Sequence, residues 1–184
     1  HAAYDLSDKY FLSLAYTGRV LRRSGNDFAG GHGLAVSVGK WYTPLSSWRL
    51  GLDYGYYGAA PRYMSLALSA DYMFNLSAFT AGYNSDRLFD LIALGGVYAG
   101  VGNSQKKNEF VYGVRAGVQG RFNVSSGIDL FIEPQLLASR VSRNDNGLGF
   151  DPEARLMVGL NYKLGGNTVA GGKRTFDKRN YFSV

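Results

Sequence analysis

The chain has 184 residues, a formal net charge of +6, 25 glycines, 14 tyrosines and no cysteine. This length suits one domain, and the lack of cysteine excludes thiolate metal sites and a disulfide framework. The longest nearly apolar run, Leu91–Val101, has 11 residues. A membrane-spanning helix needs about 18 or more apolar residues, so this run argues against a helical membrane protein.

The first half of the chain alternates apolar residues with small or polar ones. A period of two is typical of strands whose two faces meet different surroundings. The cleanest repeat runs from Trp48 to Tyr57, where every even position is apolar or aromatic. In chain order we expect a strand at Tyr10–Arg19, a loop at Arg22–Gly31, a strand at Leu34–Tyr42, a turn at Thr43–Ser47, a strand at Trp48–Tyr57, a loop at Gly58–Arg62, a strand at Met64–Tyr72 and a longer connection at Thr80–Leu88.

The second half continues the same alternation and brings the expected number of strands to eight. The phase of the fifth strand is set by Asp90, which we place on the inner face, and Pro134 predicts a local bulge because it removes a ladder donor. The expected elements are a strand at Phe89–Val101, a loop at Asn103–Asn108, a strand at Phe110–Phe122, a hairpin turn at Ser125–Gly127, a strand at Ile128–Leu137, a loop at Ser142–Pro152 and a strand at Glu153–Leu164.

The last expected strand is about 11 residues long, whereas strands in globular proteins usually have about 5–6. A strand of that length, tilted by about 45°, crosses the hydrocarbon layer of a bilayer. Its leucines alternate with Arg155, Gly159 and Lys163. Eight long strands joined by short connections favour an all-β fold, an antiparallel up-and-down transmembrane β-barrel with eight strands.

Two observations favour leucines that face lipid over leucines that face a core. The polar face carries mainly Gly, Ala and Ser with isolated charges, which suits a narrow eight-stranded interior better than a water-facing sheet. Aromatic residues lie towards the strand ends of the apolar face, as in the girdles of membrane barrels. The expected girdle comprises Tyr10, Tyr16, Trp41, Tyr42, Trp48, Tyr54, Tyr56, Tyr72, Phe122 and Tyr162. The alternative is a soluble lipocalin-like barrel with the leucines inside.

The segment Leu156–Leu164, with an aromatic near its end, resembles the closing strand of bacterial outer-membrane barrels. The strand count and the Arg, Asp and Glu interior resemble the N-terminal eight-stranded barrel of outer-membrane protein A. The Gly82–Asp90 connection and the Trp41–Pro44 turn resemble the versions in Bacteroides-type bacteria. The resemblance covers about Lys9 to Gly165, and it implies a bacterial outer-membrane location. Outer-membrane protein A usually continues into a peptidoglycan-binding domain, which the residues after Gly165 do not resemble.

The sequence offers weak candidates for chemistry. His1 and His32 are the two histidines, and His32 lacks the neighbouring Ser that barrel deacylases place near their His. Asp145, Asn146 and Asp151 lack the spacing of a calcium loop and are typical of turns. We therefore expect no catalytic residue, no metal site and no cofactor.

A lumenal cluster of ion pairs is the expected site, because an unpaired charge in a narrow interior is costly. The Ser125–Gly127 turn places Arg121 opposite Phe131 and diagonal to Asp129 and Glu133. Loops centred near Ala60 and Asn144 would place Arg49 opposite Asp71, and Glu133 opposite Arg155. The expected cluster comprises Arg49, Asp71, Arg115, Arg121, Asp129, Glu133 and Arg155.

The interpretation is a non-enzymatic outer-membrane barrel at residues 1–166, acting as a structural anchor or an accessory subunit of a larger complex. Residues 167–184 form a basic periplasmic tail, and both termini are periplasmic. The expected partners are outer-membrane lipid and other outer-membrane proteins, with no nucleic acid and no small-molecule substrate. Arg22-Arg23 and Lys106-Lys107 are candidates for contact with lipopolysaccharide phosphates, although solvated loop charge is the favoured interpretation. The alternatives are a narrow pore, a surface adhesin or a soluble carrier of an apolar ligand.

Overall fold

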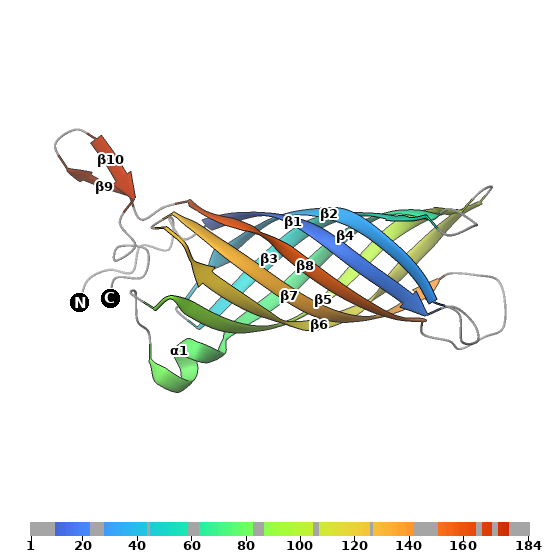
Figure 1. The fold of residues 1–184 in the computed structure, drawn as a ribbon, viewed down its shortest axis with the longest axis horizontal. Helices are drawn as coiled ribbons and strands as arrows, with labels where there is room; N and C mark the ends of the chain where they lie inside the picture. The colour runs from blue at the N-terminus through green and yellow to red at the C-terminus, as the bar shows by residue number, and fades with distance from the viewer. Residues whose placement is uncertain are drawn as a thin grey trace.

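The computed structural model describes residues 10–22, 28–43, 45–58, 63–82, 87–104, 107–125, 127–141, 151–164, 167–170 and 173–176. Eight antiparallel strands close into one barrel in the order of the sequence (Figure 1). The strands are β1 (Tyr10–Arg22), β2 (Phe28–Trp41), β3 (Ser46–Tyr57), β4 (Tyr63–Asn75), β5 (Phe89–Ser104), β6 (Lys107–Asn123), β7 (Ile128–Val141) and β8 (Asp151–Leu164). The up-and-down topology predicted from the period-two pattern is confirmed.

The barrel closes because β1 pairs with strands on both of its sides. Leu14 lies opposite Val36 of β2 and opposite Leu160 of β8. Closure leaves no free strand edge in the barrel, so each strand finds a partner on both sides for its backbone donors and acceptors. Among the described residues, no helix is long and apolar enough to cross a membrane.

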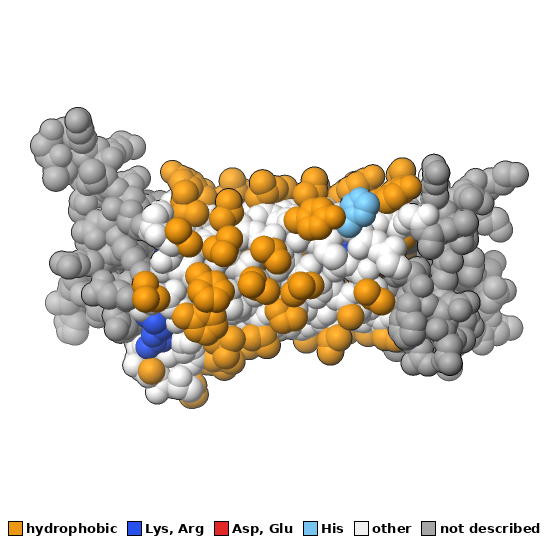
Figure 2. All heavy atoms as spheres, in the orientation of Figure 1, with side chains coloured by type: hydrophobic (Ala, Val, Ile, Leu, Met, Phe, Trp, Pro, Cys, Tyr) orange, Lys and Arg blue, Asp and Glu red, His pale blue; other side chains and the backbone are white. Residues whose placement is uncertain are grey.

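The two faces of every strand differ in the way the alternation predicts. Leu52 and Leu160 expose 44% and 50% of their surface, whereas neighbouring inward residues are buried. Large apolar side chains spread over the outer wall, as Figure 2 shows for one face. In β5, Asp90 shares its face with the buried Ile92 and Leu94, so the predicted phase of this strand is correct.

The two ends of the barrel differ in their connections. One end, called the α1 end, carries the start of β1, the end of β8, the turns at 42–45 and 124–127, and helix α1 (Leu76–Ala81). The far end carries the other four connections. The sequence did not lead us to predict α1. Asn75 caps the start of this helix, and its side chain accepts a hydrogen bond from the Ala78 N–H at 2.9 Å. Such capping is typical of Asn at a helix start.

Several expected boundaries are wrong because the strands at the far end are longer than predicted. Only residues 105 and 106 separate β5 from β6, so most of the expected loop at 103–108 is strand. Phe28–Gly31 also belongs to β2. The strands are longer because neighbouring strands continue to pair beyond the predicted ends, and each additional pair of residues adds ladder hydrogen bonds.

Pro134 does not produce the predicted bulge. The pairing of β6 with β7 keeps the same register on both sides of Pro134, from Gly120 opposite Ile132 to Gly117 opposite Gln135. Pro134 instead points outward, opposite Leu156 of β8. Glu133 and Pro134 have no ladder partner on β6, so the pairing is interrupted at the proline without a shift of register.

The predicted tail contains a second, separate sheet that sequence reasoning did not find. It pairs β9 (Asn167–Ala170) with β10 (Lys173–Phe176), and it is not part of the barrel. The boundary between the two sheets falls close to the expected end of the barrel segment.

Candidate functional site in the barrel lumen

Arg49 connects opposite walls of the barrel. It projects from β3, and its Nη1 and Nη2 atoms each donate to Glu133 of β7 at 2.7 Å. Three strands separate β3 from β7 in either direction around the barrel, so this bidentate pair crosses the full width of the lumen. Its Nε also donates to Asp71 at 2.9 Å. A planar guanidinium can hold two carboxylates in this way, whereas a lysine ammonium cannot present the same fork.

Glu133 is the acceptor at the centre of this arrangement. Besides the two bonds from Arg49, it accepts from the amide of Gln119 at 2.6 Å and from the amide of Gln135. Its residue surface is completely buried. Four donors on one carboxylate compensate the loss of water around a buried charge.

Arg115 continues the network towards the far end. Its Nε donates to Asp71 at 2.6 Å and its Nη2 donates to Ser69 at 2.8 Å. Its Nη1 donates to Asp53 at 3.1 Å, and Asp53 also lies 3.6 Å from Arg155. The pairs therefore form one chain of charges and not a set of separate bridges.

Near the far end of the barrel, this network of charges includes residues that the sequence did not lead us to predict. Glu153 accepts from Arg155 at 3.2 Å and from the Tyr57 hydroxyl at 2.9 Å. Arg19 lies directly opposite Arg155 in the ladder and donates to Thr17 and to the carbonyl oxygen of Tyr54. Arg19 and Glu153 occupy inward-facing positions of the alternating pattern, so the pattern could have predicted that they lie in the lumen.

All seven residues of the predicted cluster are buried in the lumen, with at most 7% of their surface exposed. Arg49 lies opposite Asp71, as the turn geometry predicted. The predicted contact of Glu133 with Arg155 is wrong, because the strands are offset by two residues and Gln135 takes that place. Arg121 also makes no direct contact with Glu133 and reaches it through Gln119.

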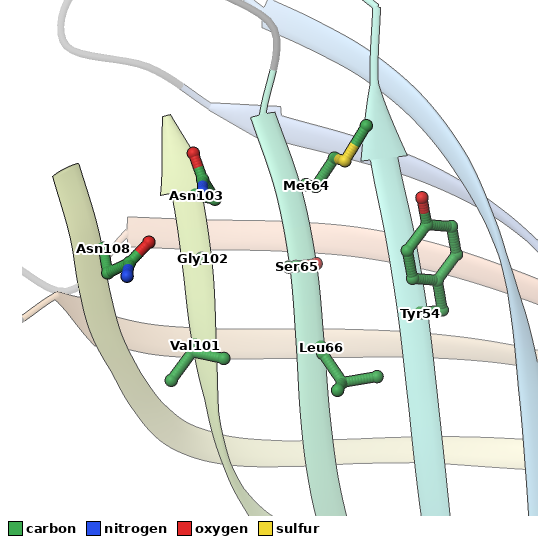
Figure 3. A pocket seen from close by; sticks show the side chains of 8 residues that line it. All are labelled: Tyr54, Met64, Ser65, Leu66, Val101, Gly102, Asn103 and Asn108. Carbon is green, nitrogen blue, oxygen red and sulfur yellow. The ribbon is translucent and has the colours of Figure 1, made fainter. Parts of the chain in front are cut away.

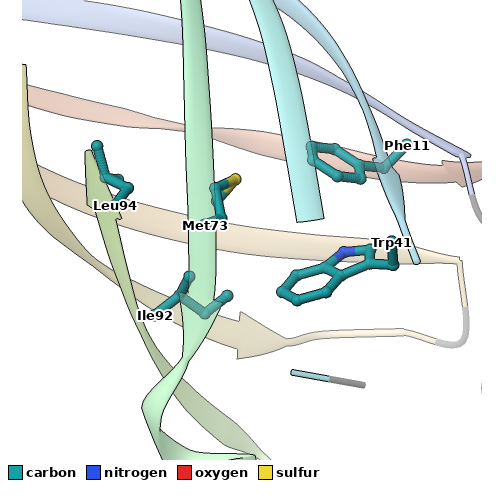
Figure 4. Packing of buried hydrophobic residues seen from close by; sticks show 5 residues of the cluster. All are labelled: Phe11, Trp41, Met73, Ile92 and Leu94. Carbon is teal, nitrogen blue, oxygen red and sulfur yellow. The ribbon is translucent and has the colours of Figure 1, made fainter. Parts of the chain in front are cut away.

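A second layer fills the lumen at the α1 end with apolar side chains. Phe11, Trp41, Met73, Ile92 and Leu94 form one buried cluster, contributed by four strands (Figure 4). Trp41 was expected in the outer girdle, and this is wrong, since only 2% of its surface is exposed. Trp41 is the last residue of β2, and it faces inward like the buried Ala35 of the same strand. Its ring centroid lies 6.4 Å from that of Phe11.

Arg121 joins the apolar layer to the charged one. Its guanidinium carbon lies 5.5 Å from the ring centroids of both Phe11 and Trp41. Nη2 of Arg121 donates to Gln119 at 2.8 Å, and Nη1 lies 4.0 Å from Asp129. Asp129 in turn pairs with Lys163 at 2.8 Å. Because β6 and β2 are also opposite strands, Arg121 is a second side chain that crosses the lumen.

Inward glycines provide the space for these large side chains. A Cβ atom at Gly39 would collide with the Phe11 ring, and one at Gly55 would collide with the Arg19 guanidinium. The narrow interior of an eight-stranded barrel is just wide enough to be filled by side chains, so each large residue needs a small neighbour. Part of the high glycine content is thereby explained.

A groove of about 290 Å³ lies on the outer wall near the far end, not in the lumen (Figure 3). Outward side chains of β3 to β6 line most of it. Its lining comprises Tyr54, Met64, Ser65, Leu66, Val101, Gly102, Asn103 and Asn108. The groove is a hollow in the wall between apolar side chains and offers no cluster of chemically reactive groups.

His32 lies on the outer wall and not among the charged residues of the lumen. Its ring stacks on Tyr16, with centroids 6.2 Å apart, and faces Tyr56 at 5.7 Å. The described part of the chain contains no group of three or more His, Cys, Asp or Glu that could hold a metal ion. His1, Asp145 and Asn146 lie outside the described residues, as do Arg23 and Lys106 and the side chains of Arg22, Lys107 and Asp151.

Nine of the ten expected girdle aromatics lie on the outer wall. Tyr16 exposes 56% of its surface and Tyr162 exposes 53%. Near the α1 end, Lys40 lies 4.8 Å from the Tyr10 ring centroid and 5.8 Å from that of Tyr42. Aromatic and basic side chains at the border of an apolar belt are typical of the membrane–water interface.

Comparison of the sequence with protein families and with curated proteins finds no match. Comparison with solved structures finds bacterial barrels of the same fold. Neisserial surface protein A matches with a TM-score of 0.65 and 12% identity, over 84% of this chain and 97% of that one. The N-terminal β-barrel domain of Pseudomonas aeruginosa OprF matches with a TM-score of 0.52 and 15% identity, over 85% of this chain and 100% of that one.

The outer membrane protein OprG from Pseudomonas aeruginosa matches with a TM-score of 0.51 and 7% identity, over 84% of this chain and 95% of that one. At such low identities the likeness concerns the fold. The chain thus has the fold of the eight-stranded bacterial outer-membrane barrels, and the predicted resemblance is confirmed at this level.

Proposed function

We propose that the chain is a transmembrane β-barrel of the bacterial outer membrane with a closed lumen and no enzymatic activity. The observation that carries this proposal is the contrast between the two faces of the strands. Apolar side chains cover the outer wall, while a hydrogen-bonded network of charges fills the inside. Such a wall is stable against hydrocarbon but would be costly in water.

Membrane residence is tested by extraction and by gel mobility. The protein should remain with the membrane fraction until detergent is added, and the unboiled protein should migrate differently from the boiled one. Recovery of a monomer that needs no detergent would contradict the proposal. A carrier of apolar ligands is disfavoured, because the centre of the described lumen holds paired charges where such a ligand would lie.

The closed lumen supports a structural role over a pore. Arg49 and Arg121 each cross the lumen to the opposite wall, and the apolar cluster around Trp41 adds a second obstruction. Purified protein in planar bilayers should therefore show little steady conductance. Large and stable channels from the monomer would contradict the closed lumen and would favour the narrow pore.

A barrel whose described residues fill the lumen and form no reactive centre suits an anchor or an accessory subunit of a larger outer-membrane complex. Two of the four connections at the far end, residues 58–62 and residues 105–106, are short, and this argues against an adhesin. Purification from native membranes in mild detergent, followed by identification of the proteins that accompany it, tests this role. Recovery of the barrel alone, at every detergent concentration that preserves other complexes, would contradict it.

We further propose that the α1 end faces the periplasm, with both termini on that side. The even strand number brings the start of β1 and the end of β8 to the same end, opposite each other at Tyr10 and Leu164. The short turns between β2 and β3 and between β6 and β7 lie at that end too, and short turns are typical of the periplasmic side of such barrels. A cysteine at Asn26, in the connection at the far end, should react with an impermeant label on intact cells. A cysteine at Ser125, in a turn at the α1 end, should not. The reverse pattern would invert the orientation, and with it any contact of the far end with lipopolysaccharide.

A further inference from the structure

Helix α1 and Leu88, the residue just before β5, expose large apolar side chains. Phe79 on the helix exposes 65% of its surface, and Leu88 before β5 exposes 77%. Figure 1 shows α1 beside the barrel wall at its end, not across the mouth of the lumen. The helix thus lies next to the outer wall and not over the interior.

The segment is held firmly in this position. The Leu91 N–H donates to the Ser77 hydroxyl at 2.8 Å, which ties the helix to the first residues of β5. The Asn123 N–H donates to the Leu88 carbonyl oxygen at 2.9 Å, which ties the connection to the end of β6. The backbone at Leu88 is thus hydrogen-bonded to the barrel next to its exposed side chain.

The exposed side chains are continuous with the apolar belt of the outer wall. The Phe79 ring centroid lies 5.5 Å from that of Phe74 on β4. Next to Leu88, Phe89 lies 5.0 Å from Phe122 on β6, and each exposes 41% of its surface. An aromatic surface thereby runs from the wall onto the helix.

The helix also lacks the charges that a water-facing helix would carry. Its sequence, LSAFTA, contains no acidic or basic residue. The nearest described charges after it are Arg87 and Asp90, which pair with each other at 3.6 Å. An aromatic helix that carries no charge of its own, lies adjacent to the lipid belt and has the Arg87–Asp90 pair beside it fits the boundary between lipid headgroups and acyl chains.

We infer that α1 and Leu88 form an interfacial foot that inserts into the headgroup region of the leaflet at the α1 end. The occupant of this surface is phospholipid. Phe79 and Leu88 enter the lipid layer, to a depth of about 5–10 Å like the apolar faces of interfacial helices. The foot fixes the depth of the barrel at one side of its circumference. This inference rests on the proposed transmembrane function.

Site-directed spin labels can test the foot, because the chain contains no cysteine. Four single variants, Phe79→Cys, Leu88→Cys, Leu52→Cys and Ser125→Cys, are labelled and reconstituted in vesicles of phosphatidylethanolamine and phosphatidylglycerol. Collision of each label with oxygen, which concentrates in lipid, is compared with collision with a water-soluble nickel chelate. Leu52 reports the middle of the outer wall, and Ser125 is the control in an exposed polar turn at the same end.

Labels at positions 79 and 88 should collide several-fold more often with oxygen than with the chelate, as at position 52, whereas position 125 should show the reverse. Water-like values at both 79 and 88 with lipid-like values at 52 would overturn the foot and leave the barrel in the membrane. Low collision with both reagents at 79 and 88 would show a protein cover, such as a second copy, and would also overturn it. Water-like values at 52 would instead overturn the transmembrane placement itself.

Discussion

The outer wall and the lumen are built from alternate residues of the same eight strands, yet they are specified in different ways. On the wall, Leu50, Leu52 and Tyr54 of β3 are all exposed, and any large apolar side chain could replace them. In the lumen, Arg49 and Asp53 of the same strand have partners on β4, β6, β7 and β8. The wall depends on the kind of residue, while the lumen depends on particular pairs.

This difference follows from the surroundings of each face. A lipid-facing side chain needs only to be apolar, since hydrocarbon makes no directional bonds. A charged lumenal side chain has lost its water and must find donors or acceptors at defined positions. We therefore expect substitutions in the lumen to be more costly and more specific than those on the wall.

The largest effect should come from Glu133→Ala. The change removes the acceptor for Arg49, Gln119 and Gln135 together, and it leaves Arg49 without one of its two carboxylates. We expect a loss of about 3–5 kcal/mol in the free energy of unfolding, as for other broken buried ion pairs. Urea unfolding in vesicles, followed by tryptophan fluorescence, measures it. A loss below about 1 kcal/mol would mean that water enters the lumen and hydrates these groups.

A charge on the wall should be the next most costly. Leu52 lies in the middle of β3, so Leu52→Arg would place a cation near the bilayer midplane at a cost of about 2–4 kcal/mol. Leu164→Arg is the matched control, because Leu164 ends β8 at the α1 end and should cost about 0–1 kcal/mol. Equal losses in the free energy of unfolding at the two positions, measured by the same method, would show that the cost of a charge on the wall does not depend on its depth in the membrane.

Arg49→Lys tests whether the lumen depends on geometry as well as on charge. Lysine keeps the charge but cannot hold Glu133 through two parallel bonds while also donating to Asp71. We expect a loss of about 1–3 kcal/mol in the free energy of unfolding, because acceptors are left partly unsatisfied. An unchanged stability would show that net charge alone holds the network.

The sequence could predict the barrel because the alternation repeats in every strand. Each strand carries several apolar residues of one parity, so a single exception such as Phe131, which is buried, does not change the phase. Trp41 was misplaced because an aromatic ring at a strand end can face either side of the wall, and only its packing against Phe11 shows that it lies inside. Helix α1 was missed because six residues give almost no periodic signal.

The candidate site was predictable residue by residue but not pair by pair. Inward parity identified the buried charges. The Ser125–Gly127 turn gave the register of Arg121 with Phe131, and a loop centred on Ala60 gave that of Arg49 with Asp71. The register across residues 142–150 could not be derived, since a long loop does not fix the offset of its strands. The contact of Arg49 with Glu133 crosses the barrel, and neither parity nor register predicts such a pair.

The smallest effect is expected at the rim, where an ion pair meets solvent. Arg87 and Asp90 lie 3.6 Å apart, and their side chains expose 19% and 21% of their surface. A double-mutant cycle with Arg87→Gln and Asp90→Asn should give a coupling energy of about 0–1 kcal/mol, because water screens partly exposed pairs and two long side chains lose freedom.

The matching cycle with Arg49→Gln and Glu133→Gln should give a larger coupling energy, since this pair is buried and bidentate. Moderate salt should weaken the rim coupling and leave the lumenal one nearly unchanged, because screening acts mainly on exposed charges. A rim coupling as large as the lumenal one would show that solvent reaches both sites alike, and it would remove the physical basis for separating the lumen from the wall.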